Sequence, residues 1–177
     1  MDSPFVILTG ASGSGKTAIA DYIAQSHSGA TVFRFDSIGV PDAAVMASYG
    51  DGYQPGGAWQ RAMTLDWIDR IASLRDPGRP MLFEGQMRIA FIKEAITRVN
   101  ISLSRIVLVD CDDVTRFLRL AQRGQPDLAD ENIARWALYL REEAVYENVE
   151  ILDTTSYSLT QSAGHVLQLL GLQASTP

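Results

Sequence analysis

A glycine-rich stretch close to the start of the chain constrains its fold more than any other feature. The stretch fits the pattern G-x-x-x-x-G-K-[ST] and consists of Gly10, Ala11, Ser12, Gly13, Ser14, Gly15, Lys16 and Thr17. An apolar run at 5–8 precedes it and a helical pattern at 18–24 follows, so it is predicted to join a strand to a helix. In that setting backbone N–H groups and the helix N-terminus surround phosphate oxygens. Lys16 can then reach the β- and γ-phosphates and the Thr17 hydroxyl can bind Mg²⁺, so the stretch predicts a nucleoside triphosphate site.

Length and composition indicate one globular domain and exclude several other classes. The chain has 177 residues, 46% hydrophobic and 20% charged, so 1–172 is predicted to form one domain, with a frayed tail at 173–177. A net charge of −6 argues against a nucleic-acid partner, which needs clustered Lys and Arg. No apolar run approaches the roughly 20 residues that span a bilayer and no signal peptide is expected, so we expect a cytoplasmic protein without a membrane partner. The single Cys111 excludes an internal disulfide.

Five strand candidates alternate with helical patterns along the chain. The strands are expected at 5–8, 31–35, 80–83, 105–109 and 149–152. The helices are expected at 18–24, 58–71, 89–99, 114–124, 133–147 and 158–170. This alternation predicts an α/β fold, in which a single domain contains a five-stranded, mostly parallel sheet flanked by helices.

Polar residues follow several predicted strands, at the edge of the sheet where ligands bind in open α/β folds. Asp36 follows the second strand and is a candidate to orient or deprotonate an acceptor hydroxyl, with helix capping as the alternative. Glu84 and Arg88 follow the third strand, and arginine suits bidentate contacts to phosphate or carboxylate. Asp110 follows the fourth strand. Either Glu84 or Asp110 is expected to support Mg²⁺ through water, and the sequence does not choose between them.

The region 41–58 has an unusual composition for its length. Its four glycines and two tyrosines favour a mobile, substrate-covering segment, and a plain surface loop is the alternative. The helix that follows places Trp59, Met63, Trp67 and Ile71 on one face. Trp67 and Ile71 are expected in the core, whereas Trp59, beside the glycines, is a candidate to stack on a substrate ring.

Three arginines share one face of the helix predicted at 114–124. Arg116, Arg119 and Arg123 are spaced i, i+3 and i+7, so their charges repel unless an anion or acidic neighbours lie near them. Because a triphosphate loop is already predicted, we favour phosphate contacts for Arg119 and Arg123, which would stabilise the transferring phosphoryl group. Solvated helix charges are the alternative.

The motifs beyond the glycine loop resemble those of the small P-loop kinases, in particular the nucleoside monophosphate kinase group that includes adenylate and UMP/CMP kinases. Residues 81–88, with the sequence Met-Leu-Phe-Glu-Gly-Gln-Met-Arg, are similar to that group's signature of three apolar residues followed by D-G-F-P-R. Residues 119–124 and 130–132 resemble its lid, R-L-x-x-R-G followed by D-D-N. The resemblance implies a P-loop NTPase fold with a short helical lid at about 113–146.

The same resemblance implies roles for individual residues. The arginine matched by Arg88 binds the acceptor phosphate in that group, and those matched by Arg119 and Arg123 line the donor and transferring phosphates. This chain departs from the pattern because Glu84 replaces Asp and Met87 replaces proline.

The lid pattern and the end of the second strand also depart from that group. The lid lacks the arginine just before its acidic pair, and Arg135 or Arg141 is the available substitute. Asp36 is more like the small-molecule kinases, such as shikimate kinase, gluconate kinase and chloramphenicol phosphotransferase, in which a matching acid engages the acceptor hydroxyl. The turn at 152–155 also resembles the adenine-side loop of these kinases, which implies ATP contacts from Asp153 and Thr154.

Together these patterns favour an ATP-dependent phosphotransferase that uses Mg²⁺. The expected partners are ATP and a small-molecule acceptor, with a hydroxyl acceptor favoured because it fits Asp36 as the base. A nucleoside monophosphate is the alternative acceptor, and it would need more arginines around Arg88. A nucleotide-binding regulatory module with little or no transfer is the alternative of another class, with a protein partner left open.

Overall fold

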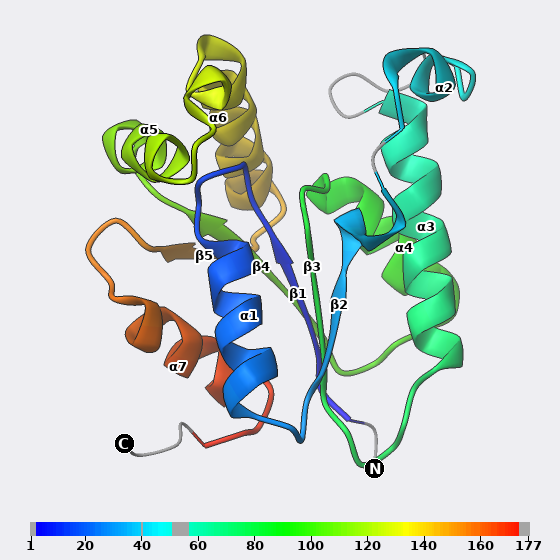
Figure 1. Ribbon diagram of the computed structural model, residues 1–177. Coiled ribbons are helices and arrows are strands. Elements are labelled where there is room, and N and C mark those ends of the chain that lie inside the picture. The colour runs from blue at the N-terminus through cyan, green and yellow to red at the C-terminus, as the bar shows by residue number, and fades with distance from the viewer. Residues whose placement is uncertain (1–2, 40, 51–56, 174–177) are drawn as a thin grey trace.

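The computed structural model describes residues 3–39, 41–50 and 57–173. A five-stranded sheet lies at its centre, with the strand order β2-β3-β1-β4-β5 and parallel pairing throughout (Figure 1). The strands are β1 (Phe5–Thr9), β2 (Thr31–Arg34), β3 (Met81–Gly85), β4 (Ser104–Asp110) and β5 (Glu150–Asp153). The α/β fold with a parallel sheet is therefore confirmed.

Helices cover both faces of the sheet (Figure 1). One face carries α1 (Lys16–Ser26) and α7 (Leu159–Leu169), and the other carries α3 (Gly57–Ser73), α4 (Ile89–Val99) and α6 (Glu131–Tyr146). Three further elements are α5 (Asp113–Gln122) and the short 3-10 helices η1 (Phe35–Ile38) and η2 (Pro126–Leu128). No helix in the described ranges is both long enough and apolar enough to cross a bilayer.

The core forms two layers because successive strand residues point to opposite faces. Val6 and Leu8 of β1 pack toward α1 and α7, whereas Phe5 and Ile7 pack toward α3 and α4. All four side chains are fully buried, as expected for a central parallel strand covered on both sides. The expected core positions on α3 are confirmed for Ile71, which is fully buried, and for Trp67, whose ring centroid lies 5.6 Å from that of Phe83.

The register of the sheet brings polar residues together at one edge. Glu84 of β3 lies opposite Leu8 of β1 and Arg34 of β2, and Asp110 of β4 lies opposite Asp153 of β5. Glu84 therefore belongs to the strand and does not follow it, which differs from the predicted strand end at residue 83. This edge also holds the glycine loop, because the loop begins where β1 ends.

The region 41–58 is only partly described. It contains α2 (Ala43–Ala47), which Asp42 caps by accepting a hydrogen bond of 2.9 Å from Val45 N, so the expected loop includes a helical turn. Residues 51–56, including Tyr53, lie outside the described residues, and the expected covering role of this segment stays a prediction. The predicted frayed tail likewise lies outside them at 174–177.

Candidate active site

The glycine loop joins β1 to α1, and its conformation depends on glycine at two positions. Gly13 has φ +81°, and a Cβ there would lie 3.0 Å from both Cγ and the carbonyl oxygen of Arg116. Gly15 has φ +102° and stands at the cap position before α1 begins at Lys16. The loop is therefore packed tightly against α5 and turns sharply into the helix N-terminus, where N–H groups favour an anion.

Lys16 is largely buried, with 9% of its surface exposed. Burial lowers the pKa of Lys16, while the charges of Glu84 and Asp36 act in the opposite direction. Glu84 is also buried, and burial raises the pKa of its carboxyl group against the opposing charge of Lys16. The three groups thus lie close enough to influence one another, although they come from α1, β3 and η1. Such a cation attracts phosphate strongly, because little water screens it.

Thr17 and Glu84 form the oxygen-rich part of the site. The Thr17 hydroxyl donates a hydrogen bond of 3.3 Å to Glu84 Oε2. Among the residues that the structure describes, no three His, Cys, Asp or Glu side chains gather to form a metal cage. One hydroxyl with a nearby carboxylate fits Mg²⁺, which keeps several waters and takes other ligands from nucleotide phosphates.

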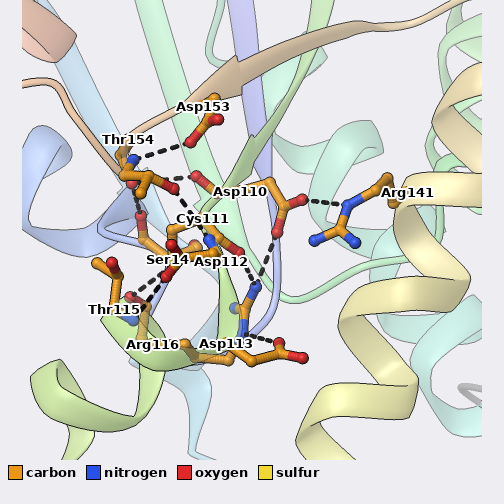
Figure 2. A network of polar contacts seen from close by, with 12 residues as sticks. Ser14, Asp110, Cys111, Asp112, Asp113, Thr115, Arg116, Arg141, Asp153 and Thr154 are labelled. Carbon is orange, nitrogen blue, oxygen red and sulfur yellow. Dashed lines mark hydrogen bonds and ion pairs between the residues drawn. The ribbon is translucent and has the colours of Figure 1, made fainter.

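Asp110, the last residue of β4, lies between two arginines (Figure 2). Its Oδ1 accepts a hydrogen bond of 2.7 Å from Arg116 Nη2, and its Oδ2 accepts one of 2.7 Å from Arg141 Nε. The Arg116 side chain is fully buried and also donates to the Ser12 carbonyl oxygen at 3.2 Å. Asp110 therefore connects the end of β4 to α5 and α6 and, through Arg116, to the glycine loop.

A cavity of about 360 Å³ opens beside the glycine loop, between α1, α5 and the segment after β5. Its lining includes Gly15, Arg119, Arg123, Thr154 and Tyr157. Arg119 donates hydrogen bonds of 2.8 Å to both Oγ1 and the carbonyl oxygen of Thr154. The guanidinium of Arg119 is thereby fixed at the cavity and does not simply face solvent. Asp153 lies one residue before Thr154, and its Oδ1 accepts from the backbone N–H of Thr155 at 2.8 Å.

Arg123 and Arg135 are exposed, whereas Arg116 is buried and Arg119 is half-buried. Arg123 lines the cavity near the end of α5, and its charge contributes to lowering the pKa of Lys16. Arg135, on α6, donates a hydrogen bond of 2.6 Å to Asn132 Oδ1 of the same helix.

Asp36 belongs to η1 and Trp59 to α3, two elements that share one core layer. Asp36 is exposed in the first turn of η1, and Arg34 occupies the cap position of that helix, so the capping alternative is not observed. The half-buried Trp59 makes an edge-to-face contact with Phe35, with ring centroids 5.8 Å apart. Because Phe35 directly precedes Asp36, Trp59 lies close to the segment that carries the candidate base.

Arg88 stands at the cap position of α4, where its side chain is only 17% exposed. Its Nε and Nη2 both lie 3.3 Å from Glu143 Oε1 of α6. The guanidinium also lies over the rings of Phe91 and Tyr139, at 4.9 Å and 5.1 Å from their centroids. The arginine expected to meet an acceptor phosphate is therefore already paired with a carboxylate.

Two residues of this region were not identified from the sequence. Gln60 of α3 accepts a hydrogen bond of 3.1 Å from Arg88 N and donates one of 2.8 Å to the Gln86 carbonyl oxygen. Glu143 pairs with Arg88 across 55 positions of sequence, and Gln60 contacts it across 28. No local pattern identifies such partners, because helical periodicity indicates only that a residue faces inward.

Comparison with protein families gave a match over most of the chain. A family model described as "AAA domain" matches residues 6–138. Comparison with curated protein sequences gave no match.

Solved structures with a similar fold include two kinases and a resistance protein. A gluconokinase from Sinorhizobium meliloti is 16% identical with a TM-score of 0.65, and the match covers 96% of this chain and 92% of that one. A tunicamycin resistance protein from Deinococcus radiodurans is 19% identical with a TM-score of 0.65, covering 99% of each chain. A shikimate kinase from Acinetobacter baumannii, solved with shikimate, is 17% identical with a TM-score of 0.62, covering 95% of this chain and 93% of that one. These neighbours confirm the resemblance to small P-loop kinases at the level of the fold.

Proposed function

The chain belongs to the family described as an AAA domain, and we propose that it is an ATP-dependent phosphotransferase acting on a small-molecule hydroxyl. The observation that carries this proposal is the meeting of three groups at one edge of the sheet. Lys16, the Thr17–Glu84 pair and Asp36 come from three separate elements, and their charges influence one another. Phosphoryl transfer depends mainly on positioning and charge stabilisation, so this set supplies what the reaction needs.

We assign the nucleotide to the glycine loop and the adjoining cavity. The triphosphate would lie on the loop backbone and Lys16, and the cavity beside Arg119 and Thr154 would take the base and ribose. The cavity volume of about 360 Å³ is in the range of sites that hold compact ligands. ATP is the proposed nucleotide because the resemblance of the turn around Asp153 and Thr154 implies an adenine-side loop.

Thr17 is the proposed Mg²⁺ ligand, with Glu84 acting through water. The hydrogen bond of 3.3 Å between them supports this assignment over Asp110, whose two oxygens already accept from Arg116 and Arg141. When bound, the metal would offset the negative charge that develops on the phosphate oxygens.

We assign the segment 113–146 as a lid within a single kinase-like domain, 1–172. Arg119 and Arg123 line the cavity beside the glycine loop, from which they would offset charge on the transferring phosphoryl group. Arg141 reaches the same edge through Asp110, as a positioning residue.

In the proposed reaction, Asp36 accepts the proton of the acceptor hydroxyl as its oxygen attacks the γ-phosphorus. The new O–P bond forms while the bond from the γ-phosphorus to the β,γ-bridging oxygen breaks, and that oxygen leaves with the electron pair as part of ADP. Trp59 lies near Asp36 and is the proposed ring contact for the acceptor. Arg88, whose backbone N–H donates to Gln60 of α3, and Glu84 are the other proposed acceptor contacts.

The experiment that tests the proposal measures ADP release from Mg·ATP across a panel of nucleosides, nucleoside monophosphates, sugars and antibiotics. The Lys16→Ala variant serves as the blank. We expect one acceptor class to raise ADP release well above that blank. If ATP binds but no compound stimulates turnover, the transferase proposal fails and a nucleotide-binding regulatory role replaces it.

A further inference from the structure

The acceptor side of the site contains two features that ordinarily attract anions. One is the guanidinium of Arg88, and the other is the N-terminus of α4, which begins at Ile89. Both lie directly after β3, at the sheet edge that carries Glu84. Whether these two features are free or already hold an anion therefore affects which charge an acceptor can carry.

A single carboxylate of the lid segment occupies both features. Glu143 of α6 is 8% exposed at its side chain and lies 3.3 Å from Arg88. It also accepts backbone N–H hydrogen bonds from Ile89 at 2.8 Å and from Ala90 at 3.3 Å. The Tyr139 hydroxyl donates to it at 3.4 Å. All four of these neighbours donate hydrogen bonds to the Glu143 carboxylate, so it satisfies both Arg88 and the first N–H groups of α4.

Among the described residues, the other cations near the acceptor side are paired or are assigned to the nucleotide. Arg34, next to Glu84 in the sheet register, forms an ion pair of 2.6 Å with Asp21. Lys16 belongs to the phosphate site.

Two carboxylates remain on this side without an ion pair among the described residues. Asp36 is exposed, and Glu84 is buried beside Thr17. A phosphate or carboxylate on the acceptor would meet these two groups and would find Arg88 already paired. Separating Arg88 from Glu143 to bind it would leave a buried charge unpaired, which is costly.

We propose that the acceptor is an uncharged or cationic hydroxyl compound and carries neither a phosphate nor a carboxylate group. This inference rests on the proposed function and specifies the substrate class of the same site. In this proposal Glu143 determines specificity, because its carboxylate occupies the place beside Arg88 that the anionic group of an acceptor would otherwise take.

The test compares matched acceptors that differ in charge, using ADP release from Mg·ATP. Suitable pairs are adenosine with AMP, uridine with UMP and glucose with gluconate, and glucosamine adds a cation. We expect stimulation by an uncharged or cationic member and about a tenfold or greater loss with its anionic counterpart.

Two variants of α6 sharpen the comparison. Glu143→Gln keeps the shape but removes the charge, so we expect the preference to shift toward anionic acceptors by about tenfold. Glu147→Gln is the matched control, because Glu147, at the C-cap of α6, forms an ion pair of 2.6 Å with Lys93 of α4, and its loss leaves the Arg88–Glu143 pair in place. Thermal unfolding of both variants checks that they fold.

The outcomes separate the two proposals. A wild-type preference for AMP, UMP or gluconate would overturn the inference and leave the transferase function standing. An equal shift of acceptor preference in Glu143→Gln and Glu147→Gln would also count against the inference. If no compound of either charge stimulates ADP release, the transferase function itself fails and the inference falls with it.

Discussion

Lys16 and Glu84 are buried residues of opposite charge type. The pKa of each is shifted by burial and by the charge of the other residue. Burial lowers the pKa of Lys16 and raises that of Glu84, while their mutual attraction acts against both changes. Burial is the larger cause for each group, so the folded protein holds charges that water would stabilise better. Sites of this kind favour function at the expense of stability.

The role of Asp36 can be tested by removing its charge. We expect Asp36→Asn to lower kcat by about 10²- to 10⁴-fold, the range typical of a general base, with the Kd for Mg·ATP nearly unchanged. Asp42→Asn is the matched control, because Asp42 caps α2 and asparagine caps about as well. Steady-state kinetics with the identified acceptor and titration of the nucleotide provide the two readouts. Full turnover in Asp36→Asn would remove Asp36 from the chemistry.

Glu84 should make stability depend on pH in a defined direction. Its pKa in the folded state is raised, so the folded protein binds this proton more readily than the unfolded chain. The contribution of Glu84 to the free energy of unfolding is therefore present at low pH and is lost as pH rises through its folded-state pKa. Because glutamine does not titrate, Glu84→Gln should gain stability relative to the wild type as pH rises from about 4 to 8. The gain should be ~1.4 kcal/mol for each pH unit that separates the folded-state pKa of Glu84 from its unfolded-state pKa.

Urea unfolding of the two proteins at several pH values measures this difference. The exposed Glu142→Gln serves as the matched control for loss of a carboxylate. We also expect Glu84→Gln to reduce ADP release, since Thr17 loses its carboxylate partner. A stability difference that shrinks with rising pH would contradict the assignment of burial as the main cause.

At the scale of elements, α5 is the part that holds the glycine loop in place. Gly13 lies against the backbone and side chain of Arg116, and Arg116 reaches both Ser12 and Asp110. The Asp110 carboxylate in turn holds Arg141 of α6 (Figure 2). One buried arginine of α5 therefore links the loop to the end of β4 and, through Asp110, to α6.

The contacts of Arg116 predict a large loss of stability from a single substitution. Arg116→Met should reduce the free energy of unfolding by about 3–5 kcal/mol, because it leaves Asp110 with one partner and the Ser12 carbonyl oxygen with none from this side chain. Arg70→Met, which removes an exposed pair with Asp66 at 3.9 Å, should change it by no more than about 0.5 kcal/mol. Denaturant unfolding of the three proteins gives both values. Similar small changes in the two variants would show that the buried network is not what stabilises α5.

At the scale of the whole molecule, local patterns were sufficient to predict the fold. Five parallel strands, the main helices and the glycine loop follow from periodicity and turn residues, which act over a few positions. Tertiary contacts distinguish the two acids that the sequence left as alternatives: Glu84 lies beside Thr17, whereas Asp110 lies between arginines. The pairing of Arg88 with Glu143 joins residues far apart in the chain, so no local pattern could identify it.

Nucleotide binding should stabilise the molecule as a whole, because the proposed site is assembled from β1, α1, α5 and the segment after β5, which the unfolded chain does not bring together. At a free Mg·ATP concentration about 100 times the Kd, the free energy of unfolding should rise by ~2.7 kcal/mol. Lys16→Ala should lose most of this increase at the same concentration, since it removes the cation that meets the phosphates. Thermal unfolding with Mg·ATP, with Mg²⁺ alone and with ATP plus a chelator separates the contributions of nucleotide and metal. A rise in Tm with Mg²⁺ alone would place the metal on the protein without the nucleotide, against the single hydroxyl and water-mediated carboxylate proposed here. Equal stabilisation of the wild type and Lys16→Ala would move the nucleotide away from the glycine loop.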